Sequence, residues 1–203
     1  GTFSKAHGMG DIELLGDVAP IEIGNLVWLD TDSDGVQDAD EVGINGVIVK
    51  LFKAGVEIAS ALTDANGNYI FSNDPNGTSS ASHIYNLTSL DPNIEYVVRI
   101  ENVMGGSKQA ALGVNSLTTS NTGEGTNTNI NDSDGISASN DADVTVLATD
   151  IPLLGANNHS FDFGFSPAPP PCSIAITSAT STICDPLTNT YVRLNVKRLK
   201  IYI

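Results

Sequence analysis

The sequence is poor in basic residues and lacks long apolar runs. Its 203 residues include nine lysines and arginines against 24 aspartates and glutamates, which gives a net charge of −15. This charge repels phosphate backbones and anionic lipid surfaces, so we expect no nucleic-acid partner. No stretch approaches the roughly 18 consecutive apolar residues of a membrane-spanning helix, so we expect no membrane span. Because 40% of the residues are hydrophobic, the chain can still build a core.

Histidine and cysteine are also scarce. The three histidines, His7, His83 and His159, are far apart in the sequence, and no Cys-x-x-Cys or His-x-x-x-His pair is present. A zinc site is therefore not expected. Cys172 and Cys184 are twelve residues apart, and in an oxidising compartment they could form a disulfide that contributes roughly 3 kcal/mol.

Signatures of catalysis are missing as well. The sequence has no Gly-x-Ser-x-Gly elbow, no phosphate-binding glycine loop and no cysteine with a plausible histidine partner. These motifs supply the nucleophiles and anion cradles of common enzyme classes. We therefore expect a protein that is not an enzyme.

The acidic segment D-T-D-S-D-G-V-Q-D-A-D-E, residues 30–41, matches every fixed position of the twelve-residue calcium-loop template. Its alternating carboxylates supply hard oxygen ligands, and the glycine at the sixth position permits the sharp turn. Without a cation these carboxylates would repel one another. A solvated acidic loop is the alternative. The pattern predicts a Ca²⁺ site with the ligands Asp30, Asp32, Asp34, Val36 through its backbone carbonyl, Asp38 and Glu41.

The segments on either side of this loop have the character of β-strands. Residues 21–29 and 47–53 are rich in β-branched and aromatic residues and show no helical stripe. An EF-hand sensor needs a pair of helices that can open. We therefore expect calcium to staple a strand-to-strand connection and not to operate a switch.

Further strand signals recur along the chain, and their spacing favours an all-β sandwich or barrel. Asn66-Gly67 predicts a tight hairpin turn, because glycine accepts the positive φ that such turns need. Near the end, Phe161, Phe163 and Phe165 alternate onto one face of a closing strand. The expected strands beyond the first two are 56–63, 69–72, 84–88, 96–100, 142–149 and 158–165.

Residues 102–142 are rich in glycine, serine, threonine and asparagine, and we expect a long excursion without sustained periodicity. Within it, residues 131–136 repeat the core of the acidic motif, but the template is broken at its first and ninth positions. A second, partial calcium site and an Asx-rich turn both remain open. The candidate ligands are Asp132, Asp134, Ile136, Asn140, Asp141 and Asp143.

These patterns suggest four parts. Residues 1–19 form an N-terminal arm, and residues 20–167 form the calcium-binding β-sandwich. Residues 168–171 belong to a stiff proline-rich linker. Residues 172–203 form a short C-terminal β segment, too small to build a core alone, which is either part of a second module or a strand for assembly.

Three landmarks together resemble the B-type repeat of serine-aspartate repeat surface proteins, which is related to the collagen-adhesin B-type and prealbumin-like modules. They are residues 24–30, which lead into the acidic loop, residues 63–71 around Asn66-Gly67, and residues 161–165. The resemblance implies an Ig-like or prealbumin-like Greek-key β-sandwich on the outside of a bacterial cell. It also implies a structural calcium site at the acidic loop and a role as a stalk or spacer in adhesins and surface filaments.

The end of the chain suggests how such a module could assemble. Residues 191–203 alternate apolar and polar positions with a slip at Arg198, and no evident partner strand of their own accompanies them. They hold four of the nine basic residues, so only five basic residues face all 24 acidic residues in the rest of the chain. We expect self-association or contact with neighbouring surface modules by strand addition, which could build a filament. An ordinary edge strand of a truncated second module is the alternative.

A different function is compatible with the same sequence. Long loops often carry binding sites. The 102–142 segment could therefore make the chain a ligand-binding adhesin domain that recognises a host, matrix or glycan molecule.

Overall fold

The computed structural model describes residues 19–120 and 128–168, together with the backbone of four short strands in the C-terminal segment. The chain divides into two compact units, residues 1–167 and residues 168–203, which are described separately. Cys172, Cys184 and the expected arm up to residue 18 lie outside the described residues.

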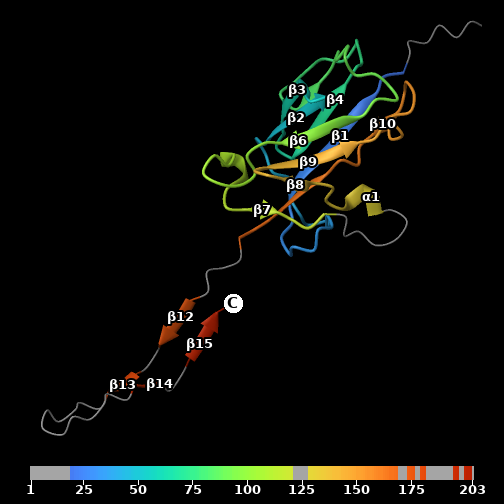
Figure 1. The fold of residues 1–203 in the computed structure, drawn as a ribbon. Coiled ribbons are helices and arrows are strands. Elements are labelled where there is room, and N and C mark those ends of the chain that lie inside the picture. Colours follow the sequence, from blue (N-terminus) through green and yellow to red (C-terminus); the bar gives the residue numbers. More distant parts are fainter. Residues whose placement is uncertain are drawn as a thin grey trace, which may run out of the picture. The chain divides into compact units, whose positions relative to one another are not determined.

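The first unit contains two β-sheets, as Figure 1 shows. One sheet has the strand order β5-β4-β1-β11-β7, with β10 also paired to β1. Its strands are β1 (Glu22–Leu29), β4 (Asn68–Ser72), β5 (His83–Ile84), β7 (Ser116–Leu117), β10 (Asn157–Asn158) and β11 (Phe163–Ser166).

The other sheet has the order β3-β2-β6-β9-β8. Its strands are β2 (Ile48–Lys53), β3 (Val56–Leu62), β6 (Tyr96–Ile100), β8 (Ile136–Ala138) and β9 (Asp141–Val146). The helical elements of the described residues are the short α1 (Thr128–Asn131) and the 3-10 turn η1 (Ala110–Leu112). The expectation of an all-β protein is confirmed.

Both sheets contribute to one buried core. Val27 and Phe71 from the first sheet and Val98 and Val144 from the second belong to a single cluster of buried side chains. Each strand can supply such residues at every second position, because side chains alternate between the two faces of a sheet. This shared core is consistent with a β-sandwich.

The Asn66-Gly67 turn has the expected backbone but a different role. Gly67 has φ of +83°, as a tight turn requires. However, the strands on either side of the turn, β3 and β4, belong to different sheets, so the predicted hairpin is wrong. β4 pairs with β1 instead, with Ile23 opposite Phe71, and the turn carries the chain from one sheet to the other.

The expected closing strand 158–165 is interrupted. β10 and β11 both pair with β1 in parallel, but residues 159–162 between them leave the ladder. The carboxylate of Asp162 fills this gap, because it accepts hydrogen bonds from the Leu26 backbone N–H and the Asn25 amide, each of 3.0 Å. Phe161, Phe163 and Phe165 are nevertheless all buried.

Two other expectations need correction. The strand predicted at 84–88 ends at Ile84, and Asn86 has φ of +60°, which is incompatible with an extended strand. The 102–142 segment is not a patternless excursion, since it contains β7, β8 and the beginning of β9. Short strands with polar, glycine-rich flanks carry too little periodicity to be recognised in the sequence.

The described strands of the C-terminal unit form two separate antiparallel pairs, each a two-stranded ribbon. β12 (Ser173–Ile176) pairs with β15 (Leu199–Tyr202), and β13 (Ala179–Ser181) pairs with β14 (Leu194–Val196). The expectation that residues 191–203 have no partner strand of their own is therefore wrong. The segment that follows Cys172 supplies the partner.

Candidate metal centre

The acidic loop leaves the end of β1 and returns to it. Trp28 pairs with Gly43 as an isolated bridge, and the Leu29 N–H donates to the Val42 carbonyl at 2.9 Å. These contacts close the base of the loop formed by residues 30–41. The connection runs between strands, as the flanking sequence predicts.

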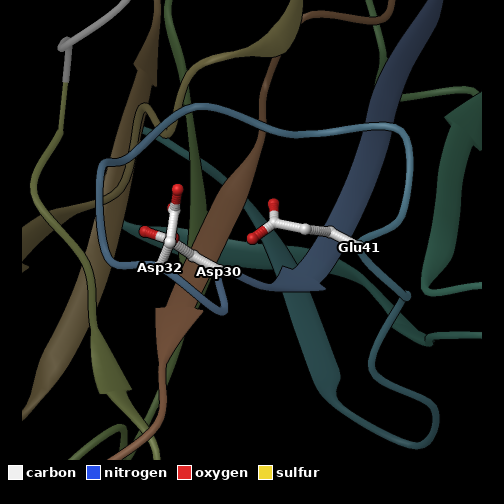
Figure 2. Close-up of side chains that lie close together, drawn as sticks. All are labelled: Asp30, Asp32 and Glu41. Atoms are coloured by element: carbon white, nitrogen blue, oxygen red, sulfur yellow. The ribbon is translucent and has the colours of Figure 1, made fainter.

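Three predicted ligands converge above this base. Asp30, Asp32 and Glu41 each offer a carboxylate oxygen, and these oxygens lie within 4.8 Å of one another. Figure 2 shows their side chains, with Asp30 and Asp32 together and Glu41 reaching toward them from the far end of the loop. Three carboxylates at this spacing form an arrangement that a hard divalent cation can bridge.

Asp30 is the most enclosed member of the group. Its side chain is fully buried, and its two oxygens accept backbone N–H bonds from Ser33 at 2.7 Å and Gly35 at 2.9 Å. The Thr118 hydroxyl also donates to Asp30. The chain can turn tightly enough to make these bonds because Ser33 and Gly35 have φ of +67° and +82°.

Glu41 is fixed from two sides. Its Oε1 accepts the Thr31 N–H at 2.5 Å, and its Oε2 accepts the Trp28 indole N–H at 2.9 Å and the Asp38 N–H at 3.1 Å. The last residue of the template is thus held against the buried end of β1, which the sequence pattern did not predict.

The remaining predicted ligands lie outside this group of three. Asp34 accepts the Val36 N–H at 2.8 Å, so its carboxylate shapes the turn. Partial desolvation and the negative charge of Asp34 raise the pKa of Asp32 above its ordinary value. A bound cation would relieve this crowding of negative charge.

The second acidic motif packs directly on the first. The Gln37 N–H donates to the Asn131 carbonyl at 2.6 Å, the Ser133 N–H donates to the Gly35 carbonyl at 2.9 Å, and Val36 pairs with Asp132 as a β-bridge. Segments about 95 residues apart in the chain therefore form one acidic region. The sequence shows the two related motifs but not this contact between them.

Asp132 is the unusual residue of this junction. Its side chain is only 3% exposed, and its Oδ1 has no hydrogen-bond partner. A buried carboxylate oxygen without a partner costs free energy unless another group compensates it. A cation at this junction is one such group, so Asp132 fits a second metal site.

Asp134 and Asp162 form a buried pair next to this junction. The Asp134 N–H donates to the Asp162 carbonyl, and the Asp162 N–H donates to Asp134 Oδ2, both at 2.9 Å. Burial raises the pKa of Asp134 to about 7. Burial and the Asp134 charge raise the pKa of Asp162 to about 8.

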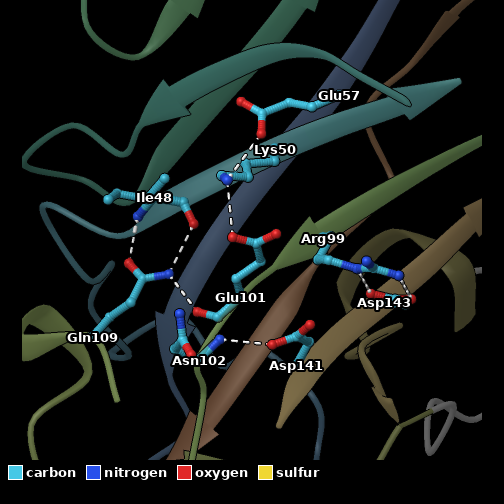
Figure 3. A network of polar contacts seen from close by, with 9 residues as sticks. All are labelled: Ile48, Lys50, Glu57, Arg99, Glu101, Asn102, Gln109, Asp141 and Asp143. Atoms are coloured by element: carbon cyan, nitrogen blue, oxygen red, sulfur yellow. Dashed lines mark hydrogen bonds and ion pairs between the residues drawn. The ribbon is translucent and has the colours of Figure 1, made fainter. Parts of the chain in front are cut away.

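The other candidates for the second site lie apart from Asp132. Figure 3 shows Asp143 in a two-pronged ion pair with Arg99, with both contacts at 2.6 Å, and Asp141 accepting the Asn102 N–H at 2.9 Å. Ile136 lies exposed on the edge strand β8, and Asn140 lies exposed in the β8–β9 turn. The structure therefore brings Asp132 and Asp134, but not the whole predicted set, to the acidic junction.

The fold and the loop together define an all-β module with a candidate cation site between two strands. Residues 21–103 match the family model of the SdrD B-like domain, so the chain contains an SdrD B-like domain. This match covers the first acidic loop and ends before the second acidic motif.

Two relatives share part of this region. Serine-aspartate repeat-containing protein C of Staphylococcus aureus (strain Newman) is 47% identical over 80 residues, which cover 39% of this chain and 8% of that protein. Colossin-B of Dictyostelium discoideum is 41% identical over 71 residues, which cover 34% of this chain and 2% of that protein. The chain therefore spans only a small part of each relative.

Proposed function

We propose that this chain is a non-catalytic, calcium-stabilised structural module of an extracellular bacterial surface protein. The observation that carries the proposal is the convergence of Asp30, Asp32 and Glu41 in a loop that joins two core strands and whose base is closed by the pairing of Trp28 with Gly43. A module of this kind would act as a spacer whose rigidity depends on calcium.

The loop chemistry supports calcium over softer metals. The ligands on offer are carboxylate oxygens, which suit Ca²⁺, and no cysteine or histidine belongs to the group formed by the described residues. A bound Ca²⁺ would supply positive charge to a region where carboxylates now repel one another. The protein's part is to hold Asp30 through backbone N–H groups and Glu41 through the Trp28 indole.

The placement on a cell surface is supported by the relatives. Residues 21–103 of this chain match the SdrD B-like domain, and 80 residues are 47% identical to a serine-aspartate repeat-containing protein of Staphylococcus aureus. Extracellular calcium is plentiful enough for loops of modest affinity. No helix in the described part of the chain is long and apolar enough to cross a bilayer.

We include a second, weaker Ca²⁺ site at the junction of the two acidic motifs. Its support is the buried Asp132 oxygen without a partner and the docking of residues 131–133 on the first loop. Occupation of this junction would tie the 102–142 segment to the first loop.

Calorimetric calcium titration of the full chain tests the proposal. Asp32→Asn should weaken binding at the first loop, whereas Asp40→Asn removes the same charge from an exposed position of that loop outside the predicted ligand set. Asp132→Asn should abolish only a second, weaker phase. No heat of binding in the unaltered chain, or equal losses for Asp32→Asn and Asp40→Asn, would contradict the proposal.

Ligand binding by the 102–142 segment is the second candidate. A groove of about 520 Å³ is lined only by residues between Val103 and Ser137, with Met104, Leu117 and Ile136 among its apolar members. A glycan or peptide that binds the chain and loses affinity on Met104→Asp would favour this function. Equal binding by a Val56→Asp variant, altered on the distant edge strand β3, is the matched control.

A further inference from the structure

One strand of the second sheet is only half covered on its outer side. β9 extends from Asp141 to Val146, but β8 pairs only with Asp141–Asp143. Residues 144–146 pair with β6 on one side and with no strand of the described residues on the other. In an antiparallel sheet, alternate residues of such an edge turn their backbone N–H and C=O groups outward.

The chain is drawn away from this edge before β8 begins. Two hydrogen bonds, from the Asp134 N–H to the Asp162 carbonyl and from the Asp162 N–H to Asp134 Oδ2, each of 2.9 Å, hold residue 134 against the interrupted closing strand of the other sheet. Residues ahead of Ile136 are therefore not available to extend β8 along β9. We call the uncovered edge at residues 144–146 the β9 notch.

The β9 notch opens onto a groove of mixed apolar and acidic character. The groove has a volume of about 460 Å³, and Ile136 and Leu147, which line it, are 59% and 50% exposed. Asp134 and Asp150 line the same groove. An open strand edge beside apolar and acidic side chains suits a strand with apolar and basic residues.

In the described part of the first unit, every lysine and arginine side chain already has a partner. Lys50 bridges Glu57 and Glu101 at 2.9 and 2.8 Å, and Lys53 pairs with Asp91 at 2.6 Å. Arg99 pairs with Asp143, and Lys108 donates to a backbone carbonyl. Figure 3 shows the Lys50 and Arg99 pairs on the same face of the sheet.

The C-terminal segment carries the complementary properties. Residues 191–203 alternate apolar side chains with polar ones on either side of a slip at Arg198, and they include Arg193, Lys197, Arg198 and Lys200. Their strands β14 and β15 each pair on one side only among the described residues. A two-stranded ribbon is marginally stable in isolation, so an additional strand neighbour would stabilise it.

We propose that residues 191–203 of one copy add as a strand to the β9 notch of a second copy. The inference rests on the proposed structural role, and it names both the partner and the surface that receives it. Donor and acceptor are different surfaces, so each copy can give one contact and receive another. Such a heterologous contact can extend into an open chain of molecules or close into a ring.

Sedimentation velocity of the full chain in excess calcium, over a wide range of concentration, tests this contact. The unaltered chain should form species larger than a dimer as concentration rises. Thr145→Lys places a positive charge on the exposed middle residue of the notch and should weaken association about tenfold or more, the equivalent of roughly 1.4 kcal/mol. Thr78→Lys adds the same charge on an exposed loop between β4 and β5 and should leave association unchanged.

A charge swap shows whether the basic strand is the donor. Arg193→Glu combined with Lys197→Glu should also weaken association, and adding Thr145→Lys to that chain should restore it. An unchanged melting temperature of each variant shows that the sandwich is intact. If the chain is a monomer at every concentration, the proposal is overturned. Docking of the ribbon on its own chain would give this result. Association that ignores Thr145→Lys would overturn the notch as the acceptor.

The calcium proposal and the assembly proposal fail separately. Calcium binding is measured by titration heat and thermal stability, whereas assembly is measured by mass. A chain that binds calcium but stays monomeric contradicts only the assembly. A chain that assembles without binding calcium contradicts only the calcium proposal.

Discussion

The Trp28 indole N–H donates a 2.9 Å hydrogen bond to Oε2 of Glu41, the residue that closes the acidic loop. Trp28 is fully buried at the end of β1, and it is the only tryptophan of the chain. A change in the Glu41 carboxylate therefore acts directly on a core side chain. Trp28 emission should report events at the candidate calcium loop.

Glu41→Gln should raise the calcium dissociation constant about tenfold or more, a loss of roughly 1.4 kcal/mol. The amide removes a negative charge and one of the two oxygens that bind the cation bidentately in this kind of loop. Calcium titration followed by Trp28 emission measures the change. Asp40→Asn is the control, because it alters charge in the same loop at an exposed position. Equal affinities for the two variants would show that Glu41 is not a ligand.

Chelation of calcium should lower the melting temperature and expose the loop to proteolysis. When free calcium is 100 times the dissociation constant, binding adds about 2.7 kcal/mol of stability. Differential scanning calorimetry with calcium and with a chelator gives the shift, and mapping of the first cleavage site should place it between residues 30 and 41. Identical melting curves in the two conditions would rule out calcium as a stabilising ligand.

The first acidic loop could be predicted from the sequence because its information is local. Alternating acids, a glycine at the sixth position and the flanking strand pattern all lie within about 30 residues. The structure gathers Asp30, Asp32 and Glu41 accordingly. The contact of Glu41 with Trp28 was not predictable, because it depends on how the loop folds back over β1.

The second acidic region could not be derived in the same way. Its ingredients are a β-bridge between Val36 and Asp132 and the pairing of Asp134 with Asp162, and these contacts join segments far apart in the chain. The hairpin predicted at Asn66-Gly67 was wrong for a similar reason. Local turn chemistry determines the φ angle of the turn but not which sheet the next strand joins.

Without calcium, the buried Asp134 and Asp162 pair should make the fold less stable as pH rises. Their pKa values in the fold are about 7 and about 8, above the ordinary value of 3.8. The folded state therefore holds more protons than the unfolded state between these limits, so stability falls with increasing pH from about 4 to about 8.

Asp162→Asn isolates this effect from the other carboxylates of the chain. The amide stays neutral and keeps one oxygen for the Leu26 N–H. In chelator, the stability of the variant relative to the unaltered chain should increase between pH 5 and pH 8 by at least about 1 kcal/mol, because one pKa unit corresponds to about 1.4 kcal/mol. Urea denaturation at the two pH values measures this difference, and a constant difference would contradict the raised pKa.

Gly67→Ala should destabilise the base of the acidic loop more than a strained turn alone would. Gly67 has φ of +83°, and a Cβ there would lie 2.2 Å from the Val27 carbonyl oxygen and 2.8 Å from the Gly43 Cα. The Val27 N–H in turn donates to the Gly67 carbonyl at 2.9 Å. The added methyl group must therefore displace β1 next to the point where the loop begins.

Gly55→Ala is the matched control for that substitution. Gly55 has φ of +78°, but a Cβ there would meet nothing within 4 Å, so only the left-handed backbone cost of about 1 kcal/mol applies. Urea unfolding should show Gly67→Ala to be less stable than Gly55→Ala by roughly 2 kcal/mol or more. Calcium affinity should fall only for Gly67→Ala, because only this turn supports the loop. Equal losses of stability for the two variants would mean that β1 and the 43–44 segment can move apart without cost, and that the packing at the base of the loop does not set its geometry.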